Sequence, residues 1–282
     1  MNKQEAISIL KEHNQEHVIK RLEALEDDAA KKLISQVAMI DWKVVESIND
    51  KSDSSSEDKK IEPLEAVEIK DIKANKEKYT AKGVEAIKNG KVAAVLLAGG
   101  QGTRLGLDKP KGTLNVGVNK DLFLFGQLIR NLLDVVDMTG AYVPLYIMTS
   151  DKNNEDTVAF FEEHNYFGYD KDYVKFFIQS MVPSVDYNGK LYMESTDSLA
   201  MSPNGNGGWF LSLMAAGLDK DMEEKGVEYV NVFAVDNILQ RIADPAFIGA
   251  TMLAGAECGS KVVRKCEPVD QNTFFIPRFL EI

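Results

Sequence analysis

The sequence is poor in cysteine and in positive charge, and it contains no long apolar run. Its 282 residues include two cysteines, Cys258 and Cys266, which are too few for a disulfide framework and typical of a reduced, cytoplasmic protein. Lys and Arg number 33 against 44 Asp and Glu, and the formal net charge of −11 argues against a nucleic-acid or anionic-membrane partner. The sequence shows no N-terminal signal pattern and no stretch that could span a membrane. We therefore expect a cytoplasmic protein whose partners are neither nucleic acid nor membrane.

Familiar nucleotide-binding patterns are also missing. No glycine is followed by Lys and then Ser or Thr in the frame of a Walker A loop. The dinucleotide fingerprint Gly-x-Gly-x-x-Gly fails because Gly106 comes one residue too late after Gly100 and Gly102, which argues against a dinucleotide-dependent oxidoreductase. His13 and His17 are one helical turn apart, as metal ligands can be. With no third ligand nearby, we interpret them as part of a solvated helix.

The most informative stretch covers 91–112, with the sequence KVAAVLLAGGQGTRLGLDKPKG. It opens with the apolar run 92–98, which predicts a strand buried on both faces of a parallel sheet. A glycine-rich turn follows, and three cations lie in it or just after it: Arg104, Lys109 and Lys111. Glycines let backbone N–H groups approach an anion and the cations supply charge, so the stretch predicts a polyphosphate site. The alternative is a glycine turn with incidental surface cations.

The remainder of the chain alternates helices and strands in the manner of a βα-wound sheet. Further strands are predicted at 145–149, 174–179 and 229–235, with a hairpin at 185–193. Helices are predicted over 77–89, 123–135, 154–164, 208–225 and 244–257. Ahead of them, 3–48 is helical in pattern and the serine-rich, charged run 49–60 is a linker. The expected organisation is an N-terminal helical region with its linker, 1–60, and an α/β core, 61–282.

Polar or glycine residues also follow two later strands, where parallel sheets bind ligands. Asp236 follows the strand at 229–235 and is a candidate Mg²⁺ ligand; the alternative is that it caps the next turn. The run 201–208, MSPNGNGG, is a second glycine-rich loop that could lie against a base or a sugar. Its alternative reading is a turn that starts a helix with a capping Asn.

Leu97 to Gly106, LAGGQGTRLG, followed by Pro110-Lys111-Gly112, resembles the signature loop of the eukaryotic-type UDP-sugar pyrophosphorylase family. The resemblance is greatest to its UDP-N-acetylglucosamine pyrophosphorylases and bacterial uridylyltransferases, and matching segments run from residue 80 to residue 265. It implies a Rossmann-like nucleotidyltransferase core with a mixed, mostly parallel sheet, preceded by an N-terminal helical segment. It also implies uridylyl transfer from UTP to a sugar 1-phosphate, with Mg²⁺ as cofactor. N-acetylglucosamine 1-phosphate is the favoured acceptor and glucose 1-phosphate the alternative.

The resemblance further implies roles for individual residues. Arg104 would bind the leaving β,γ-phosphates, and Lys111 would bridge these phosphates and the transition-state oxygens. Gln179 matches a family glutamine that hydrogen-bonds the uracil edge, and Asp236 matches the metal-binding aspartate. In the second loop, Gly205 would contact the base and Asn206 the sugar hydroxyls. The other positions implied in substrate binding are Leu97, Ala98, Gly99, Gly100, Gly102, Thr103 and Pro203.

The match ends after Lys265. Relatives continue with further sheet strands, much of the sugar pocket, a second phosphate-binding lysine and a small C-terminal domain, whereas here 271–282 reads QNTFFIPRFLEI. We therefore expect an incomplete C-terminal part, an unpaired sheet edge near Lys261, and weak UTP binding with poor turnover. The alternative from another class is a non-catalytic UTP-binding remnant. The sequence predicts no particular oligomeric state.

Overall fold

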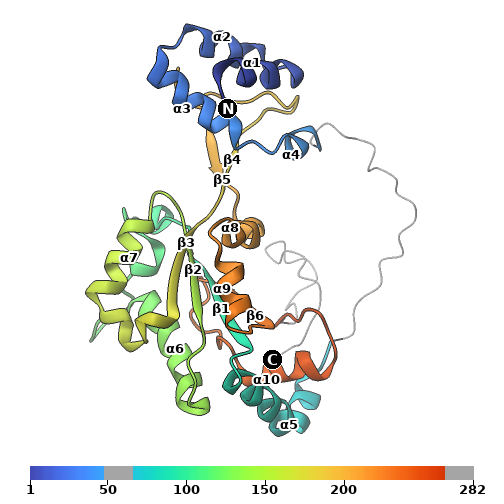
Figure 1. The fold of residues 1–282 in the computed structure, drawn as a ribbon. Helices are drawn as coiled ribbons and strands as arrows, with labels where there is room; N and C mark the ends of the chain where they lie inside the picture. The colour runs from blue at the N-terminus through green and yellow to red at the C-terminus, as the bar shows by residue number, and fades with distance from the viewer. Residues whose placement is uncertain (48–65, 264–282) are drawn as a thin grey trace, which may run out of the picture. The chain divides into compact units, whose positions relative to one another are not determined.

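The computed structural model describes residues 1–47 and 66–263 (Figure 1). The chain divides into two compact units: one holds Met1–Lys60 and Ser180–Asn204, and the other holds Ile61–Gln179 and Gly205–Ile282. The division has the boundary expected at residue 60, but Ser180–Asn204, expected in the core, groups with the N-terminal helices. The predicted linker at 49–60, Cys266 and the departure after Lys265 lie outside the described residues.

The first unit contains the helices expected over 3–48, namely α1 Lys3–Glu12, α2 Glu16–Ala24, α3 Asp27–Ala38 and α4 Trp42–Ser47. A capping box starts α1, since Asn2 accepts from the Glu5 N–H while the Glu5 carboxylate accepts from the Asn2 N–H. The later segment supplies an antiparallel ribbon of β4 Met181–Pro183 and β5 Met201–Pro203. Apolar side chains of the helices bury themselves against Leu191 and Leu199 of that segment, which explains why the two segments form one unit.

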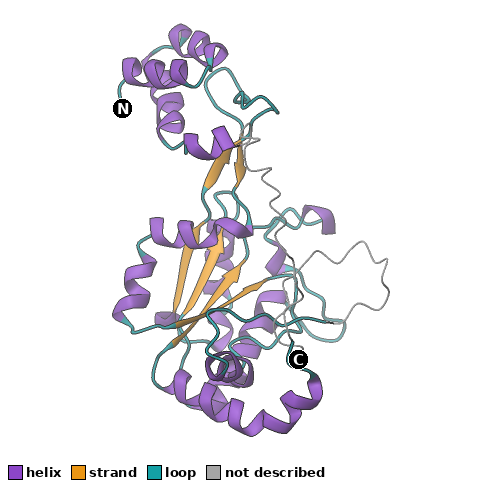
Figure 2. Ribbon diagram, turned by 90° about the vertical axis from the view of Figure 1, so that its right-hand side faces the viewer, coloured by secondary structure: helices purple, strands orange, loops and turns teal. Residues whose placement is uncertain are grey.

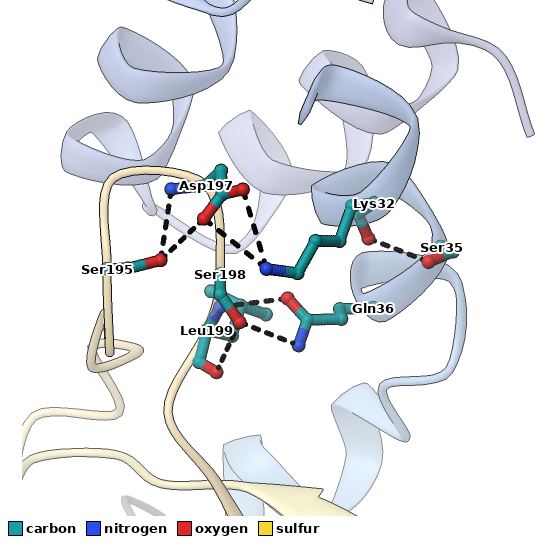
Figure 3. A network of polar contacts seen from close by, with 7 residues as sticks. All are labelled: Lys32, Ser35, Gln36, Ser195, Asp197, Ser198 and Leu199. Atoms are coloured by element: carbon teal, nitrogen blue, oxygen red, sulfur yellow. Dashed lines mark hydrogen bonds and ion pairs between the residues drawn. The ribbon is translucent and has the colours of Figure 1, made fainter. Parts of the chain in front are cut away.

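Polar side chains of α3 pair with the loop between β4 and β5 (Figure 3). Gln36 Oε1 accepts a hydrogen bond from the Leu199 N–H at 2.8 Å, and its Nε2 donates to Ser198 Oγ at 3.2 Å. Lys32 Nζ lies 3.4 Å from the Asp197 carboxylate. One amide side chain thus satisfies both a donor and an acceptor of this loop.

The hairpin expected over 185–193 closes through the single bridge Val185↔Leu191 in place of a continuous ladder. Gln15 adds side-chain bonds to this hairpin, because it donates to Gly189 O and accepts from the Leu191 N–H, each at 2.9 Å. His17 Nε2 lies 2.7 Å from Leu191 O. Helix side chains and backbone bonds, such as the Asp186 N–H to Lys190 O at 2.9 Å, therefore hold this loop together.

The second unit is built on a four-stranded parallel sheet in the order β3-β2-β1-β6 (Figure 2). The strands are β1 Val92–Leu97, β2 Leu145–Thr149, β3 Val174–Ile178 and β6 Tyr229–Ala234. This sheet confirms the α/β core expected from the alternating pattern. Within the described residues β6 pairs only with β1, and an open groove of about 880 Å³ lies beside it, lined in part by Val230, Phe247 and Lys261. At the sheet edge expected near Lys261, Val262 is a single bridge residue.

Helices cover both faces of the sheet. The face that carries Ala94, Leu96 and Ile147 packs against α5 Ile69–Lys88, α6 Leu124–Thr139, α7 Asn154–Glu163 and α10 Pro245–Leu253. The opposite face, with Ala93 and Tyr146, packs against α8 Trp209–Ala215 and α9 Leu218–Glu224. No helix in the described ranges combines the length and the apolarity that crossing a bilayer requires. The sheet is thus buried on both sides, as the continuous apolar run at 92–98 predicts.

Two of the predicted helices differ most from their predicted bounds. The helix predicted over 208–225 is two helices, α8 and α9. Gly217 lies between them with φ of +71°, a left-handed conformation that a continuous helix does not contain. The helix α5 begins at Ile69, ahead of the predicted start at residue 77.

Asp221 anchors α9, since Lys175 Nζ and Tyr146 Oη each donate to its carboxylate at 2.6 Å. Burial raises the pKa of Asp221, but these hydrogen bonds and a third from Lys225 outweigh it and hold the pKa well below its usual range.

The helices α5 and α10 approach each other at backbone distance. A Cβ added at Gly83 would lie 1.9 Å from Pro245 O, and one added at Gly249 would lie 1.9 Å from Tyr79 O. Neither carbonyl can move without moving its helix. Glycine at these two positions therefore sets the spacing between the helices and the level at which they cover the sheet.

We predict that Gly83→Ala destabilises the protein by about 3 kcal/mol, because the added methyl group collides with a backbone carbonyl. The sign of this change distinguishes a collision from an open position, because replacing glycine by alanine in an open helix interior raises the free energy of unfolding by about 1 kcal/mol. Urea denaturation measures the change. Ala81→Ser, at an exposed position of the same helix, is the control and should shift stability by no more than about 0.5 kcal/mol. A stabilised Gly83→Ala protein would contradict the close packing.

Candidate functional site

The glycine-rich loop after β1 folds back on itself. The Gly102 N–H donates to Lys109 O at 3.0 Å, and the Lys111 N–H donates to Gly100 O at 3.3 Å. These bonds return the chain to the end of β1 and bring Lys111 beside the first glycines. Thr103 and Arg104 lie between them, in the 3-10 turn Thr103–Leu105. The loop is therefore a closed structure at the carboxyl end of the central strand, where open α/β sheets bind ligands.

Gln179 lies directly against the first glycine of this loop. A Cβ added at Gly99 would lie 2.4 Å from Gln179 Nε2, so the amide occupies the space that a side chain would need. The Gln179 N–H donates to Thr149 O at 2.9 Å, which holds the residue at the end of β3. With 6% of its surface exposed, Gln179 is a buried polar side chain beside the glycines. The structure thus brings together two predicted site residues separated by eighty positions in the sequence.

Lys111 and Asp236 also meet. Asp236 follows β6, which is fixed to the central strand by the Val235 N–H that donates to Leu97 O at 3.2 Å. The Lys111 ammonium forms an ion pair with Asp236 Oδ1. The Asp236 side chain remains 61% exposed and faces solvent in part, so it is accessible to a ligand. The turn after the strand is closed by Asn237, whose Oδ1 accepts from the Leu239 N–H at 3.3 Å, so capping does not explain Asp236.

The donor set around Asp236 suits a metal ion that arrives with phosphate. Along 1–47 and 66–263, no group of three or more His, Cys, Asp or Glu side chains is placed to hold a metal ion. A resident metal with several protein ligands therefore does not fit. Mg²⁺ takes one or two carboxylates and completes its shell with phosphate oxygens and water, and one accessible carboxylate beside a glycine-rich loop fits that pattern.

Sequence reasoning missed Asn131, which supports the Asp236 loop. Its Nδ2 donates to Ile238 O and Gln240 O, both at 3.0 Å. The bonds tie the segment after Asp236 to α6 and limit the positions that the carboxylate can take. The available signal was a polar residue within an otherwise apolar helical segment, which periodicity alone assigns to the solvent face.

The second glycine-rich loop is divided between the two units. Pro203 ends β5 in the first unit, whereas Gly205 and Asn206 belong to the second. Gly205 has φ of +73° and ψ of −169°, a backbone conformation that side chains disfavour. The helix α8 starts with Gly208 at its N-cap and with no side-chain cap, so the predicted alternative of a capping Asn is wrong.

We predict that Gly99→Ala forces the Gln179 amide out of its buried position, whereas Gly100→Ala does not, because open space surrounds Gly100. The side-chain NH₂ resonance of Gln179 in a ¹H–¹⁵N spectrum reports this directly. Gly99→Ala should shift that resonance and lower the free energy of unfolding by about 1 kcal/mol. Equal effects of the two substitutions on the Gln179 resonance would contradict the contact.

Most of the chain matches known proteins. The profile of the UTP–glucose-1-phosphate uridylyltransferase family matches residues 41–273. The UDP-N-acetylglucosamine pyrophosphorylase of Saccharomyces cerevisiae is 40% identical over 222 residues, which cover 75% of this chain and 46% of the yeast protein. UDP-N-acetylhexosamine pyrophosphorylase-like protein 1 of Mus musculus is 44% identical over 197 residues, 68% of this chain and 39% of its own.

Solved structures lead to the same family. The uridine diphosphate N-acetylglucosamine pyrophosphorylase of Trypanosoma brucei, crystallised with an inhibitor, matches 91% of this chain and 56% of its own with a TM-score of 0.72 and 29% identity. The chain spans about half the length of the relatives that it matches, from 39% to 56% in these three cases. The family profile covers most of the chain and the signature loop, and the resemblance seen in the sequence is confirmed: this chain belongs to the UTP–glucose-1-phosphate uridylyltransferase family.

Proposed function

We propose that this chain transfers a uridylyl group from UTP to a sugar 1-phosphate and releases pyrophosphate. The observation that carries the proposal is the meeting of Lys111 with Asp236 beside the glycine-rich loop, at the carboxyl edge of the parallel sheet. N-acetylglucosamine 1-phosphate is the favoured acceptor, because the yeast and trypanosome relatives are named for UDP-N-acetylglucosamine. Glucose 1-phosphate is the alternative, because the family profile is named for it.

The reaction is a single in-line displacement. A phosphate oxygen of the sugar 1-phosphate attacks the α-phosphorus of UTP, the bond from that phosphorus to the β-phosphate oxygen breaks, and its electron pair leaves with pyrophosphate. No covalent intermediate on the protein is required, which agrees with a site that presents no nucleophilic Ser or Cys in its described residues. Catalysis then consists of alignment and charge stabilisation.

Lys111 supplies positive charge at the phosphates. Its ammonium pairs with Asp236 in the structure, and a triphosphate in the loop offers it oxygens of higher charge. Arg104, in the turn Thr103–Leu105 of the same loop, is assigned to the β,γ-phosphates that leave. The loop glycines bring backbone N–H groups to the same oxygens, because they leave the backbone uncovered.

Gln179 is assigned to the uracil. Its amide carries a donor and an acceptor, as the edge of a uracil ring does, and it lies against Gly99 at the mouth of the loop. Gly205 and Asn206 are assigned to the base and the sugar hydroxyls, with Pro203 in the same segment. Asp236 would hold Mg²⁺, whose charge when bound neutralises the phosphates.

Since Cys258 is a free, exposed thiol, we also propose a cytoplasmic setting.

A second candidate is a chain that binds UTP without turning it over. The open groove beside β6 favours it, because a sheet edge with few partners is a place where the fold of a longer relative can continue. The two candidates share the nucleotide site and differ in whether pyrophosphate is released.

The test is pyrophosphate release from UTP and Mg²⁺ with a panel of sugar 1-phosphates, run beside calorimetric titration of UTP. Release with N-acetylglucosamine 1-phosphate is the expected result. UTP binding without release from any sugar would favour the second candidate. A protein that neither binds UTP nor releases pyrophosphate would contradict both.

We predict that Lys111→Gln lowers turnover by about two to three orders of magnitude, the usual cost of removing a group that stabilises transition-state charge. The matched control is Lys120→Gln, the same change at an exposed lysine of the same unit, which should leave kcat and KM nearly unchanged. The effect of Lys111→Gln should fall mainly on kcat, because the lysine acts on charge that develops during transfer. Near-normal kcat in Lys111→Gln would remove Lys111 from the mechanism.

A further inference from the structure

Asn153 is a fully buried polar side chain whose hydrogen bonds all go to backbone near the glycine-rich loop. It is 0% exposed and lies at the N-cap of α7, yet it makes no side-chain cap there. Its Nδ2 donates to Ala98 O at 3.0 Å and to Gly100 O at 3.4 Å. Its Oδ1 accepts from the Ser150 N–H at 2.7 Å. One amide therefore links the end of β2 to two carbonyls of the loop after β1.

These two bonds, with the Lys111 N–H that also donates to Gly100 O at 3.3 Å, set the direction of the loop's donors. In a planar trans peptide, the C=O of one residue and the N–H of the next point in opposite directions. With the Ala98 and Gly100 carbonyls turned towards Asn153, the Gly99 and Gln101 N–H groups point away from it. Neither N–H donates a hydrogen bond to any described residue. Backbone N–H groups that point the same way and have no acceptor in the protein can bind an anion.

We propose that Asn153 is the positioning residue of the phosphate loop: it holds the Ala98 and Gly100 carbonyls inward so that the Gly99 and Gln101 N–H groups face the phosphates of the nucleotide. The inference rests on the proposed function for the identity of the anion. It adds a residue of a different segment, α7, to the machinery of phosphate binding.

The position of Asn153 is itself rigid. Ser150 O accepts from the Asn153 N–H at 3.0 Å and from the Asn154 N–H at 2.9 Å, which closes the turn between β2 and α7. The Thr149 hydroxyl donates to Asn154 Oδ1 at 2.7 Å and extends the same network to the end of β2. Because its side chain is buried and its backbone is hydrogen-bonded, Asn153 has little freedom to move, and its hydrogen bonds hold the two loop carbonyls in fixed positions.

The test substitutes Asn153→Asp, which keeps the size and the acceptor for Ser150 but turns the donor into an oxygen that faces two carbonyls. The first readout is hydrogen exchange without ligand of the two hydrogen-bonded amides of the loop, Gly102 and Lys111, which should become at least tenfold faster. The second is calorimetric affinity for pyrophosphate with Mg²⁺, which should fall about tenfold, or about 1.4 kcal/mol. Affinity for uridine, which lacks phosphates, should not change.

Asn154→Asp is the matched control, because it places the same charge one residue along the helix and keeps the acceptor that Thr149 uses. It should leave loop exchange and pyrophosphate affinity unchanged. Asn153→Ser serves if Asn153→Asp does not fold, since it keeps an N-cap oxygen but loses the donor. Unchanged exchange and unchanged pyrophosphate affinity in a folded Asn153 variant would overturn the proposal, as would an equal loss of uridine and pyrophosphate affinity.

The outcomes separate this inference from the proposed function. A wild-type protein that binds neither UTP nor pyrophosphate overturns the proposed function and the phosphate role with it. Exchange of the ligand-free loop still decides whether Asn153 holds the backbone. A wild type that binds both, with an Asn153→Asp variant that binds both equally well, overturns only the role of Asn153.

Discussion

The parallel pairing of β1 with a strand on each side is the constraint on which the rest of the second unit depends. In this register Leu97 lies opposite Met148 of β2 and Ala234 of β6, so the chain leaves all these strands at one level. The glycine-rich loop, Gln179 and Asp236 follow the carboxyl ends of three different strands and are thereby placed at one edge of the sheet. A slip of one residue in either pairing would displace a ligand-bearing segment and turn its side chains to the opposite face.

Amide side chains make this edge precise enough for chemistry. Asn153 fixes two carbonyls of the phosphate loop, and Asn131 fixes two carbonyls of the segment after Asp236. Each comes from a helix packed on the sheet, and each uses one amide group to hold two backbone positions. Loops without regular pairing have few internal hydrogen bonds, so their geometry depends on such side chains. The same device recurs in the first unit, where Gln36 holds both a donor and an acceptor of the β4–β5 loop.

Gln179 and Gly205 lie at the two points where the chain crosses between the units. The chain leaves the second unit directly after Gln179 and returns to it at Gly205, and the residues between them belong with the N-terminal helices. The residues assigned to the base therefore stand at both ends of an inserted segment. The Lys111–Asp236 ion pair is a second contact between segments that follow different strands.

The sequence by itself determined the fold class and indicated the candidate residues of the site. A continuous apolar run followed by glycines predicts a buried parallel strand and a phosphate loop, since both depend on local pattern. It could not show that Ser180–Asn204 joins the N-terminal helices, that Gly217 divides a predicted helix, or that Gln179 packs on Gly99. Nor could it identify Asn131 and Asn153, because an asparagine in a helix or at its start has the same pattern whether it faces water or a distant carbonyl. Local hydrophobic period encodes which face of a strand or helix is buried, whereas contacts between residues far apart in the chain depend on register and helix packing. Tertiary structure alone decided those contacts.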